Sequence, residues 1–287
     1  MLKLGFIGAG TVGTALSIRL RSNNYQVVAV SSRSQTSARK LAQTVNDCRA
    51  FNCNQDVADA ADLVFITTPD DTIASVATAI QWHREQSVVH CSGALSTDIL
   101  EPAKKLGAQV GSFHPLQAFA SVKQAIEDIP GSTFALEAEE PLLNTLKDIT
   151  TALDGHWIKL KASDKVVYHA AAVIACNYLV TLVKLATDLW QSFDISQSQA
   201  TRALLPLIQG TIHNIDAVGI PQCLTGPIAR GDIKTIEKHF KALQQVAPAL
   251  VSIYQELGLQ TIPIALAKSK INQQGAEKLQ SILKKHG

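Results

Sequence analysis

The glycine-rich segment Gly8-Ala9-Gly10-Thr11-Val12-Gly13 constrains the fold of this chain more than any other feature. It spells G-x-G-x-x-G, and the apolar stretch 2–8 before it predicts a strand. After it, Val12, Leu16 and Leu20 recur at helical spacing, so the glycines join a strand to a helix. In that context the motif binds the pyrophosphate of a dinucleotide.

Each glycine has a separate task in such a turn. Gly8 permits the tight turn, Gly10 lets the backbone approach the phosphates, and Gly13 lets the helix pack closely on the strand. The backbone N–H groups from Ala9 to Val12 face the phosphate oxygens at the positive end of the helix dipole. The alternative is a glycine-rich turn that binds no ligand. The agreement of motif, strand and helix favours the dinucleotide.

Apolar strands alternate with amphipathic helices through the first half of the chain. This alternation predicts an α/β fold of the Rossmann type, a doubly wound and mostly parallel sheet with helices on both faces. Ser34 is the expected N-cap of the second helix. We expect strands at 2–8, 25–32, 62–69, 87–93, 108–115, 133–136 and 156–158, and helices at 11–20, 34–45, 71–80, 97–106 and 141–153.

The second half of the chain is predicted to be all-helical, with long periodic segments at 164–192, 197–213, 233–257 and 275–285. We therefore expect a dinucleotide-binding domain at 1–160 and a helical substrate and dimerisation domain at 161–287. The stretch 166–183 is apolar enough to span a membrane, but it contains His169, Asn177 and Thr181. We interpret it as a helix buried inside the helical domain rather than as a membrane span.

The residues after the second strand indicate which dinucleotide binds. NAD sites usually carry an acidic residue there, which holds the ribose 2′-hydroxyl. This chain has Ser31-Ser32-Arg33-Ser34 instead. Arg33 can pair bidentately with a 2′-phosphate, and Ser32 and Ser34 can donate hydrogen bonds to it. NADP(H) is therefore favoured over NAD(H), the alternative being that Arg33 is an ordinary surface arginine.

Three further loops follow strands at the edge where α/β sheets bind ligands. Thr68 and Pro69 lie in the first loop and are expected to contact the cofactor, with Asp71 capping the next helix. Ser92 and Gly93 lie in the second loop, expected near the nicotinamide, and His114 lies in the third. The alternative is ordinary turn chemistry, and His90 is as easily a core histidine with satisfied hydrogen bonds.

His169 and Asn177 are the first catalytic candidates in the helical half. In a regular helix the eight residues between them correspond to about 80° of rotation, so both lie on one broad face. His169 suits proton donation to the atom that forms when hydride reaches a carbon, and Asn177 suits substrate orientation. The alternative is that both are buried polar groups with structural hydrogen bonds.

A second cluster follows at 224–232. Thr225 and Arg230 are candidate substrate-binding residues, because an arginine between small residues can reach a substrate carboxylate. Asp232 is expected to cap the following helix. The alternative is an interhelical loop with its own Asp232–Arg230 pair.

Composition excludes several classes of protein. The chain has 287 residues, 46% of them hydrophobic, and a net charge of +2, which gives no electrostatic basis for binding nucleic acid or an anionic membrane. The chain has five cysteines, and they form no C-x-x-C pair, so we expect no metal site and a reduced, cytoplasmic location. They are Cys48, Cys53, Cys91, Cys176 and Cys223.

The motifs GFIGAGTVGTAL, TTPDD, HCSGALS and FHPLQ, followed by a helical second half, resemble a Rossmann-like oxidoreductase family with an uncharacterised C-terminal domain. The layout is similar to that of pyrroline-5-carboxylate reductase, ketopantoate reductase and the 3-hydroxyisobutyrate/6-phosphogluconate dehydrogenases. The resemblance implies an NADP-dependent reductase or dehydrogenase with a cleft between domains and a dimer formed through the helices. It also assigns the 224–232 loop to that cleft.

The chain departs from these families at the expected catalytic positions. The hydroxyacid dehydrogenases carry a lysine about one helical turn before an asparagine; if Asn177 is that asparagine, the lysine position is Val173. Imine reductases have a glycine-rich stretch where this chain has AAAVIACNY. The Y-x-x-x-K pair of short-chain dehydrogenases is also missing, since Ala172 follows Tyr168 by four residues.

These observations predict an NADPH-dependent reductase of a small carbonyl or imine substrate, expected to carry a carboxylate. The helical half supplies His169, Asn177 and Arg230 in this prediction, and His114 joins them from the first domain. The alternative is a catalytically silent NADP(H)-binding sensor or scaffold, which the missing lysine favours.

Overall fold

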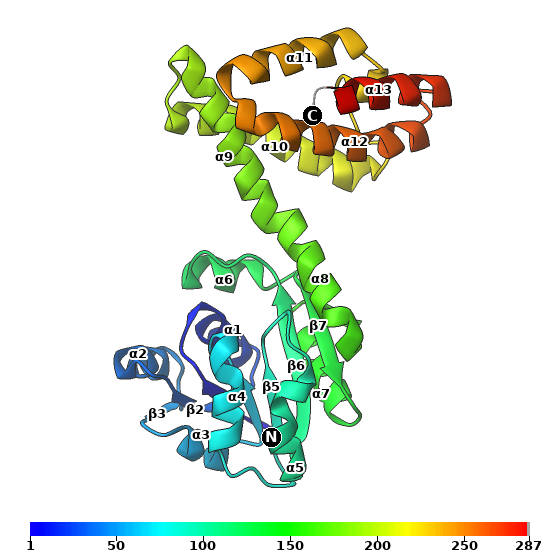
Figure 1. The fold of residues 1–287 in the computed structure, drawn as a ribbon. Coiled ribbons are helices and arrows are strands. Elements are labelled where there is room, and N and C mark those ends of the chain that lie inside the picture. The colour runs from blue at the N-terminus through cyan, green and yellow to red at the C-terminus, as the bar shows by residue number, and fades with distance from the viewer. Residues whose placement is uncertain (286–287) are drawn as a thin grey trace. The chain divides into compact units, whose positions relative to one another are not determined.

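The computed structural model describes residues 1–285, and the chain divides into two compact units, Met1–Cys176 and Asn177–Gly287 (Figure 1). The division lies inside a long helical segment rather than near residue 160, where we predicted the domain boundary. Helix α8 (Lys165–Ala172) belongs to the first unit, and the side chain of Lys165 at its start is buried there. A π-helical turn, Val173–Asn177, follows α8.

The first unit is built on one eight-stranded sheet with the order β3-β2-β1-β4-β5-β6-β7-β8. Strands β3 to β6 are parallel, β7 is antiparallel to β6, and β8 is parallel to β7. The order reverses between β1 and β4, which is the point where sheets of this type bind ligands. The strands are β1 (Lys3–Ile7), β2 (Gln26–Ser31), β3 (Arg49–Phe51), β4 (Leu63–Ile66), β5 (Ser87–His90), β6 (Gln109–Leu116), β7 (Thr133–Ala138) and β8 (His156–Lys159).

Helices cover both faces of this sheet, so the predicted doubly wound fold is confirmed. Side chains of β4 alternate between two apolar clusters: Phe65 belongs to one, and Val64 and Ile66 belong to the other. Helices α1 (Thr11–Ser22), α2 (Gln35–Thr44), α6 (Val122–Asp128) and α7 (Leu142–Ala152) pack on the Phe65 face. Helices α3 (Asn54–Ala60), α4 (Asp70–Ala79) and α5 (Glu101–Lys105) pack on the opposite face.

The second unit is helical, as predicted. Its core joins Ile236 and Phe240 to Leu279 and Leu283. The predicted helix at 233–257 is two helices, because Pro248 has no N–H for the helical ladder and its ring opposes the preceding turn. The helices are α9 (Tyr178–Trp190), α10 (Gln197–Val218), α11 (Ile233–Val246), α12 (Val251–Ala267) and α13 (Gln273–Lys285).

The apolar stretch 166–183 is not buried, which corrects our interpretation of it as a core helix. Val167 and Val180 are 73% and 70% exposed, and no residue of the most apolar window of this helix is buried. Among the described residues, one helix, Ala162–Phe193, has the length and composition needed to cross a membrane. Length and composition alone are weak evidence for a span.

Candidate functional site

The glycine turn at the end of β1 has the geometry of a phosphate cradle. Gly8 has φ +115°, a conformation that favours glycine, and a Cβ at Gly13 would lie 2.4 Å from the Gly8 oxygen and from Oγ1 of Thr67. Gly10 is different, because a Cβ there would meet nothing within 4 Å. The turn therefore needs Gly8 and Gly13 for its own packing, whereas Gly10 faces open space that a ligand can fill.

A cavity of about 660 Å³ opens beside this turn. Gly8, Ala9 and Gly10 line it from β1, and Thr68 and Pro69 line it from the end of β4. The Oγ1 atom of Thr68 is buried and has no hydrogen-bond partner in the described part of the chain, so a polar ligand would satisfy it. Thr11, Val12 and Gly13 do not line the cavity; they form the first turn of α1 behind the cradle.

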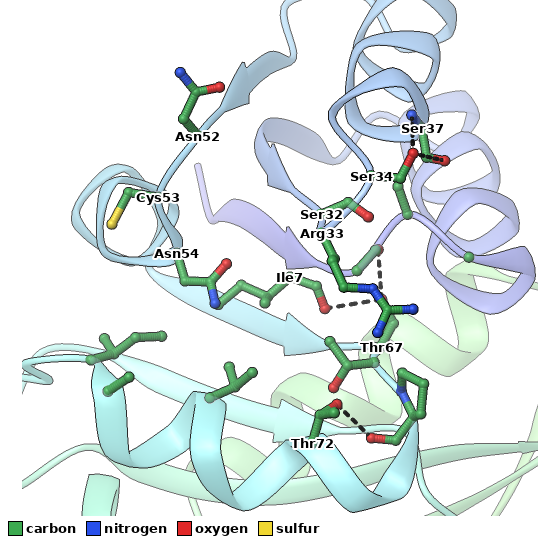
Figure 2. Close-up of a pocket in the computed structure, with 18 of the residues that line it drawn as sticks. Ile7, Ser32, Arg33, Ser34, Ser37, Asn52, Cys53, Asn54, Thr67 and Thr72 are labelled. Atoms are coloured by element: carbon green, nitrogen blue, oxygen red, sulfur yellow. Dashed lines mark hydrogen bonds between the residues drawn. The ribbon is translucent and has the colours of Figure 1, made fainter.

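The residues predicted to select the cofactor lie around the β2 end of the same cavity. Figure 2 shows Ser32, Arg33 and Ser34 there, and Thr67 and Thr72 on the β4 and α4 side. The side chain of Ser34 accepts a hydrogen bond from the backbone N–H of Ser37 at 3.3 Å, which confirms the predicted N-cap of α2. Arg33 is exposed and forms no ion pair within the described residues, so its guanidinium is available to a phosphate.

Sequence reasoning missed the β3 side of the cavity. Asn52, Cys53, Asn54 and Gln55 line it, directly after the three-residue strand β3. This strand gave no clear pattern, because it is short and its residues are only partly buried or exposed. Oδ1 of Asn54 accepts a hydrogen bond of 2.7 Å from the Ser31 hydroxyl, which fixes this wall of the cavity to β2.

A second group of polar residues surrounds the loop after β5. Nε2 of His90 donates to the Ser96 carbonyl at 3.2 Å, and Nδ1 of His90 accepts from the Ser92 N–H at 3.2 Å. His90 is therefore a buried histidine with both ring nitrogens satisfied, as the structural alternative proposed. The Ser92 hydroxyl donates to Oδ2 of Asp70 at 2.6 Å and accepts from Ala94 N–H, so Ser92 fixes the loop.

The bond between Ser92 and Asp70 also joins the two groups of residues, since Asp70 directly follows Pro69 of the cavity wall. Asp71 does not cap α4 as predicted. Helix α4 begins at Asp70, so the N-cap position is that of Pro69, whose side chain has no acceptor for the free backbone N–H groups. Asp71 lies inside the first turn, beyond the N-cap position.

Gly93, His114 and His169 meet in the structure, as their predicted roles require. A Cβ at Gly93 would lie 2.7 Å from Nε2 of His114 and 2.8 Å from Cδ2 of His169, so the glycine backbone packs against both rings. The two imidazoles lie with their centroids 6.4 Å apart. Nδ1 of His114 lies 2.8 Å from the hydroxyl oxygen of Tyr168, a residue that sequence reasoning did not select.

Lys165 is another residue of this cluster that sequence reasoning missed. Its side chain is buried, and its ammonium donates hydrogen bonds to the Ser92 carbonyl and to the Ser112 hydroxyl. No lysine stands at Val173, where the family resemblance led us to expect one. The available signal was that Lys165 precedes His169 by four residues, which puts the two on one side of a helix.

At neutral pH the cluster holds the neutral imidazoles of His90 and His114 beside the buried ammonium of Lys165. Burial, and then the charge of Lys165, lower the pKa of His90 to about 4 and that of His114 to about 4. Burial lowers the pKa of Lys165 and raises that of Tyr168 to about 12. The phenol and the His114 imidazole therefore stay uncharged at neutral pH. The Tyr168–His114 pair is thus uncharged before it acts, and it carries one negative charge after it gives a proton to a bound ligand, until solvent returns the proton.

The remaining candidates belong to the second unit. The π-helical turn ends at Asn177, so the 80° relation to His169 calculated for a regular α-helix does not apply. Thr225 and Arg230 are exposed residues of the helical unit, and their roles stay predictions. Asp232 caps α11 as predicted, accepting from the Thr235 N–H at 3.1 Å. Among the described residues, no group of three or more His, Cys, Asp and Glu side chains is arranged to hold a metal ion.

Comparison with known families finds two domain models, and the boundary between them lies earlier in the chain than the boundary between the two units. Residues 1–115 match the model of a Rossmann-like domain, and residues 132–261 match that of a domain of unknown function, DUF2520. A comparison with curated protein sequences returned no match.

Solved structures extend the similarity over almost the whole chain. Protein TM1727 of Thermotoga maritima is 28% identical with a TM-score of 0.75, covering 91% of this chain and 99% of its own. A candidate NADP oxidoreductase of Bacteroides fragilis, BF3122, is 25% identical with a TM-score of 0.72, covering 91% and 98%.

A pyrroline carboxylate reductase of Plasmodium falciparum, solved with NADP bound, is 15% identical with a TM-score of 0.57, covering 98% of each chain. At that identity the likeness concerns the fold, and it agrees with the resemblance noted from the sequence. The chain therefore carries a Rossmann-like domain followed by a domain of the DUF2520 family.

Proposed function

We propose that this protein is an NADPH-dependent reductase of a small carbonyl or imine compound. The observation that carries the proposal is the hydrogen bond between Ser92 and Asp70. It joins a cavity with a dinucleotide cradle to a cluster of proton-carrying side chains at the same edge of one sheet. A redox cofactor and a proton donor side by side are what such a reduction requires.

The residues of the cavity fit a dinucleotide phosphate. Gly10 leaves the space that a pyrophosphate needs, the buried Thr68 hydroxyl lacks a partner, and Arg33 suits a 2′-phosphate. The similar structures include a candidate NADP oxidoreductase and a reductase with NADP bound, which supports NADP as the cofactor. When bound, NADPH supplies a hydride to the carbon of the C=O or C=N bond.

The protein's own chemical task is to deliver a proton to the oxygen or nitrogen of that bond. Tyr168 is the group that we assign to this step, because its hydroxyl shares a hydrogen bond with His114 and lies on the helix that carries His169. His114 accepts from or donates to the phenol, depending on its tautomer. With its proton on Nδ1, His114 can return that proton to Tyr168 while its Nε2 takes up a proton from solvent. His169 packs against His114 and completes this wall of the site.

The substrate is proposed to be small and to carry a carboxylate. Arg230 and Thr225 keep their predicted role in holding that carboxylate, with Asn177 orienting the reacting group. The name of the similar Plasmodium falciparum reductase denotes an imine with a carboxylate, which supports this substrate class. The alternative of a catalytically silent sensor rests on the missing lysine. A buried lysine, Lys165, does lie in the cluster, where Ser92 and Ser112 accept its hydrogen bonds.

The test is NADPH oxidation by the purified protein, followed by absorbance, with a panel of 2-oxo acids, cyclic imines carrying a carboxylate, and uncharged ketones. We expect turnover with the substrates that carry a carboxylate. The Arg230→Ala variant should raise KM for these substrates and not for the uncharged ketones. Tight NADPH binding without turnover on any of them would instead identify a sensor, and the absence of any response to nicotinamide nucleotides would remove the proposal altogether.

We further propose that the exposed apolar surface of α9 and α10 binds a second copy of the chain. Val180 on α9 and Leu207 on α10 are 70% and 67% exposed, and further apolar side chains are exposed on both helices. Apolar surfaces of this kind are typical of obligate interfaces between subunits. A homodimer would cover them in an aqueous, cytoplasmic setting, which is the location that we predict for this protein.

A further inference from the structure

Glu137 is a buried carboxylate that the proposed reaction does not use. It lies on β7 and is 8% exposed. Its Oε1 accepts hydrogen bonds from the Thr97 hydroxyl at 2.8 Å and from the Thr97 N–H at 3.2 Å. Its Oε2 is buried and has no hydrogen-bond partner among residues 1–285. A buried carboxylate in this state is costly unless an opposite charge lies nearby.

The register of the sheet brings Glu137 to Lys165. Glu137 is paired directly with Ser112 across the antiparallel strands β7 and β6, so both side chains lie on one face of the sheet. The Ser112 hydroxyl accepts a hydrogen bond from the Lys165 ammonium. Glu137 and Lys165 are therefore both neighbours of Ser112, both side chains are buried, and the charge of Glu137 acts on Lys165 without an ion pair within 4 Å among the described residues.

Glu137 is the charged group best suited to neutralise Lys165. The other acidic groups that act on Lys165 are the Cys91 thiol and Asp70. Burial raises the pKa of Cys91 to about 12, so the thiol stays neutral, and Asp70 is an exposed residue that accepts from Ser92. Both hydrogen-bond acceptors of Lys165 are uncharged, and the nearby His90 and His114 are neutral imidazoles, so none of these groups offsets its charge.

We propose that Glu137 is a positioning residue of the site, which keeps the buried Lys165 ammonium charged and clamped to Ser92 and Ser112. The clamp ties the start of α8 to the loop after β5 and to β6, three elements that carry Tyr168, Gly93 and His114. This inference rests on the proposed function, since it concerns the alignment of the Tyr168–His114 pair. Without the negative charge of Glu137, Lys165 loses its proton more easily, and its hold on α8 weakens.

The first experiment measures the protonation of Lys165 without any turnover. Lysines are labelled with 13C at Cε, the NMR signal of Lys165 is identified by its loss in Lys165→Met, and its titration is followed with pH. We expect the Lys165 pKa to fall by more than one unit in Glu137→Gln. Glu139→Gln is the matched control, because Glu139 is an exposed carboxylate close by in the chain, and it should leave the Lys165 signal unchanged.

The second experiment follows the pH dependence of kcat with a substrate found by the NADPH oxidation assay. In Glu137→Gln the alkaline limb of kcat should move to lower pH while the Kd for NADPH stays constant, and Glu137→Asp should restore the wild-type profile. In the Lys165→Met background, adding Glu137→Gln should change the profile no further. This double variant also removes both buried charges, so its kcat profile can be compared with that of Lys165→Met even if Glu137→Gln alone does not fold.

An unshifted Lys165 titration in Glu137→Gln would overturn the inference, whatever the protein reduces. If Glu137→Gln shifts the Lys165 titration but leaves the pH profile of kcat unchanged, the positioning role of Glu137 is overturned. Wild-type protein that binds NADPH but reduces no substrate would contradict the proposed function instead, which the NMR titration reports on separately.

Discussion

The hydroxyl oxygen of Tyr168 lies 2.8 Å from Nδ1 of His114, although the two residues are 54 positions apart in the sequence. If this phenol delivers the proton, Tyr168→Phe should lower kcat by about 100-fold, the lower end of what a positioned acid contributes. The Kd for NADPH should not change, because Tyr168 does not line the cofactor cavity. Steady-state kinetics and fluorescence titration measure the two quantities.

Tyr254→Phe is the control for this change, since Tyr254 forms a similar bond of 2.7 Å with Nδ1 of His239 in the helical unit. It should leave kcat unaltered. Full activity in Tyr168→Phe would show that another group donates the proton.

Gly10 and Gly13 should respond differently to alanine. Gly10→Ala adds a methyl group that meets no protein atom within 4 Å, so the melting temperature should stay the same while NADPH affinity falls at least about tenfold. Gly13→Ala forces a contact at 2.4 Å with Gly8 and Thr67, so it should lower the melting temperature. Thermal unfolding and NADPH titration of both variants separate a ligand cradle from a purely structural turn.

Arg33→Asp should reverse the cofactor preference. Losing a charge-assisted pair with the 2′-phosphate should weaken NADPH binding by about 10- to 100-fold, and the new carboxylate should hold the 2′-hydroxyl of NADH. Arg39→Asp tests for a general charge effect, because Arg39 is exposed on α2 and does not line the cavity. Unchanged NADPH affinity in Arg33→Asp would contradict the assignment of NADP.

Stability should fall in acid because of the buried histidines. The pKa of His90 is lowered from 6.5 to about 4 in the folded protein, so the unfolded chain binds more protons between these pH values. The stability that depends on a neutral His90 is fully present above pH 6.5 and is lost as the pH falls to 4. Its size is on the order of 3 kcal/mol of unfolding free energy. His114 acts in the same direction.

Urea unfolding at several pH values measures this dependence. His90→Gln should flatten the slope below pH 6.5, whereas His156→Gln, a change at an exposed histidine, should preserve it. An equal slope in all three proteins would assign the acid sensitivity to other groups.

Val180→Lys should dissociate the proposed dimer. The substitution puts a charge in the middle of the exposed apolar surface of α9. Analytical ultracentrifugation should give the mass of two chains for the wild type and of one chain for the variant. Arg202→Glu on α10 tests whether any charge change on these helices has the same effect. A monomeric wild type, or recovery of the wild type in the membrane fraction, would contradict the second copy as the partner of this surface.

The α/β half of this fold follows from the sequence because each strand pattern there is local. Continuous apolar strands, a glycine turn and Ser34 as N-cap each depend on a few neighbouring residues, and the structure has them all. The three-residue strand β3 escaped prediction, because only its pairing with β2 marks it as a strand. The loop residues at 52–55 were missed with it.

The catalytic cluster was harder to predict, because its members come together only through the sheet register. His114, Gly93 and His169 were selected for their chemistry, but nothing in the sequence states that β5 runs beside β6 in parallel register, or that Lys165 fixes the start of α8 to these strands. Lys165 was overlooked since the search followed the spacing of another family to Val173. Burial decided its importance, and a lysine at the start of a helix normally reaches solvent.

Thr67 connects the glycine turn to the centre of the sheet. Its N–H donates to the Ile7 carbonyl at 2.8 Å and its hydroxyl to the Gly8 carbonyl at 2.8 Å, while the Gly8 N–H donates to Ser31 on the other side at 2.8 Å. The turn is thus held from both neighbouring strands before any nucleotide arrives. A recognition loop that is already rigid loses little conformational entropy on association, so the cofactor should be captured in a single fast step without slow rearrangement.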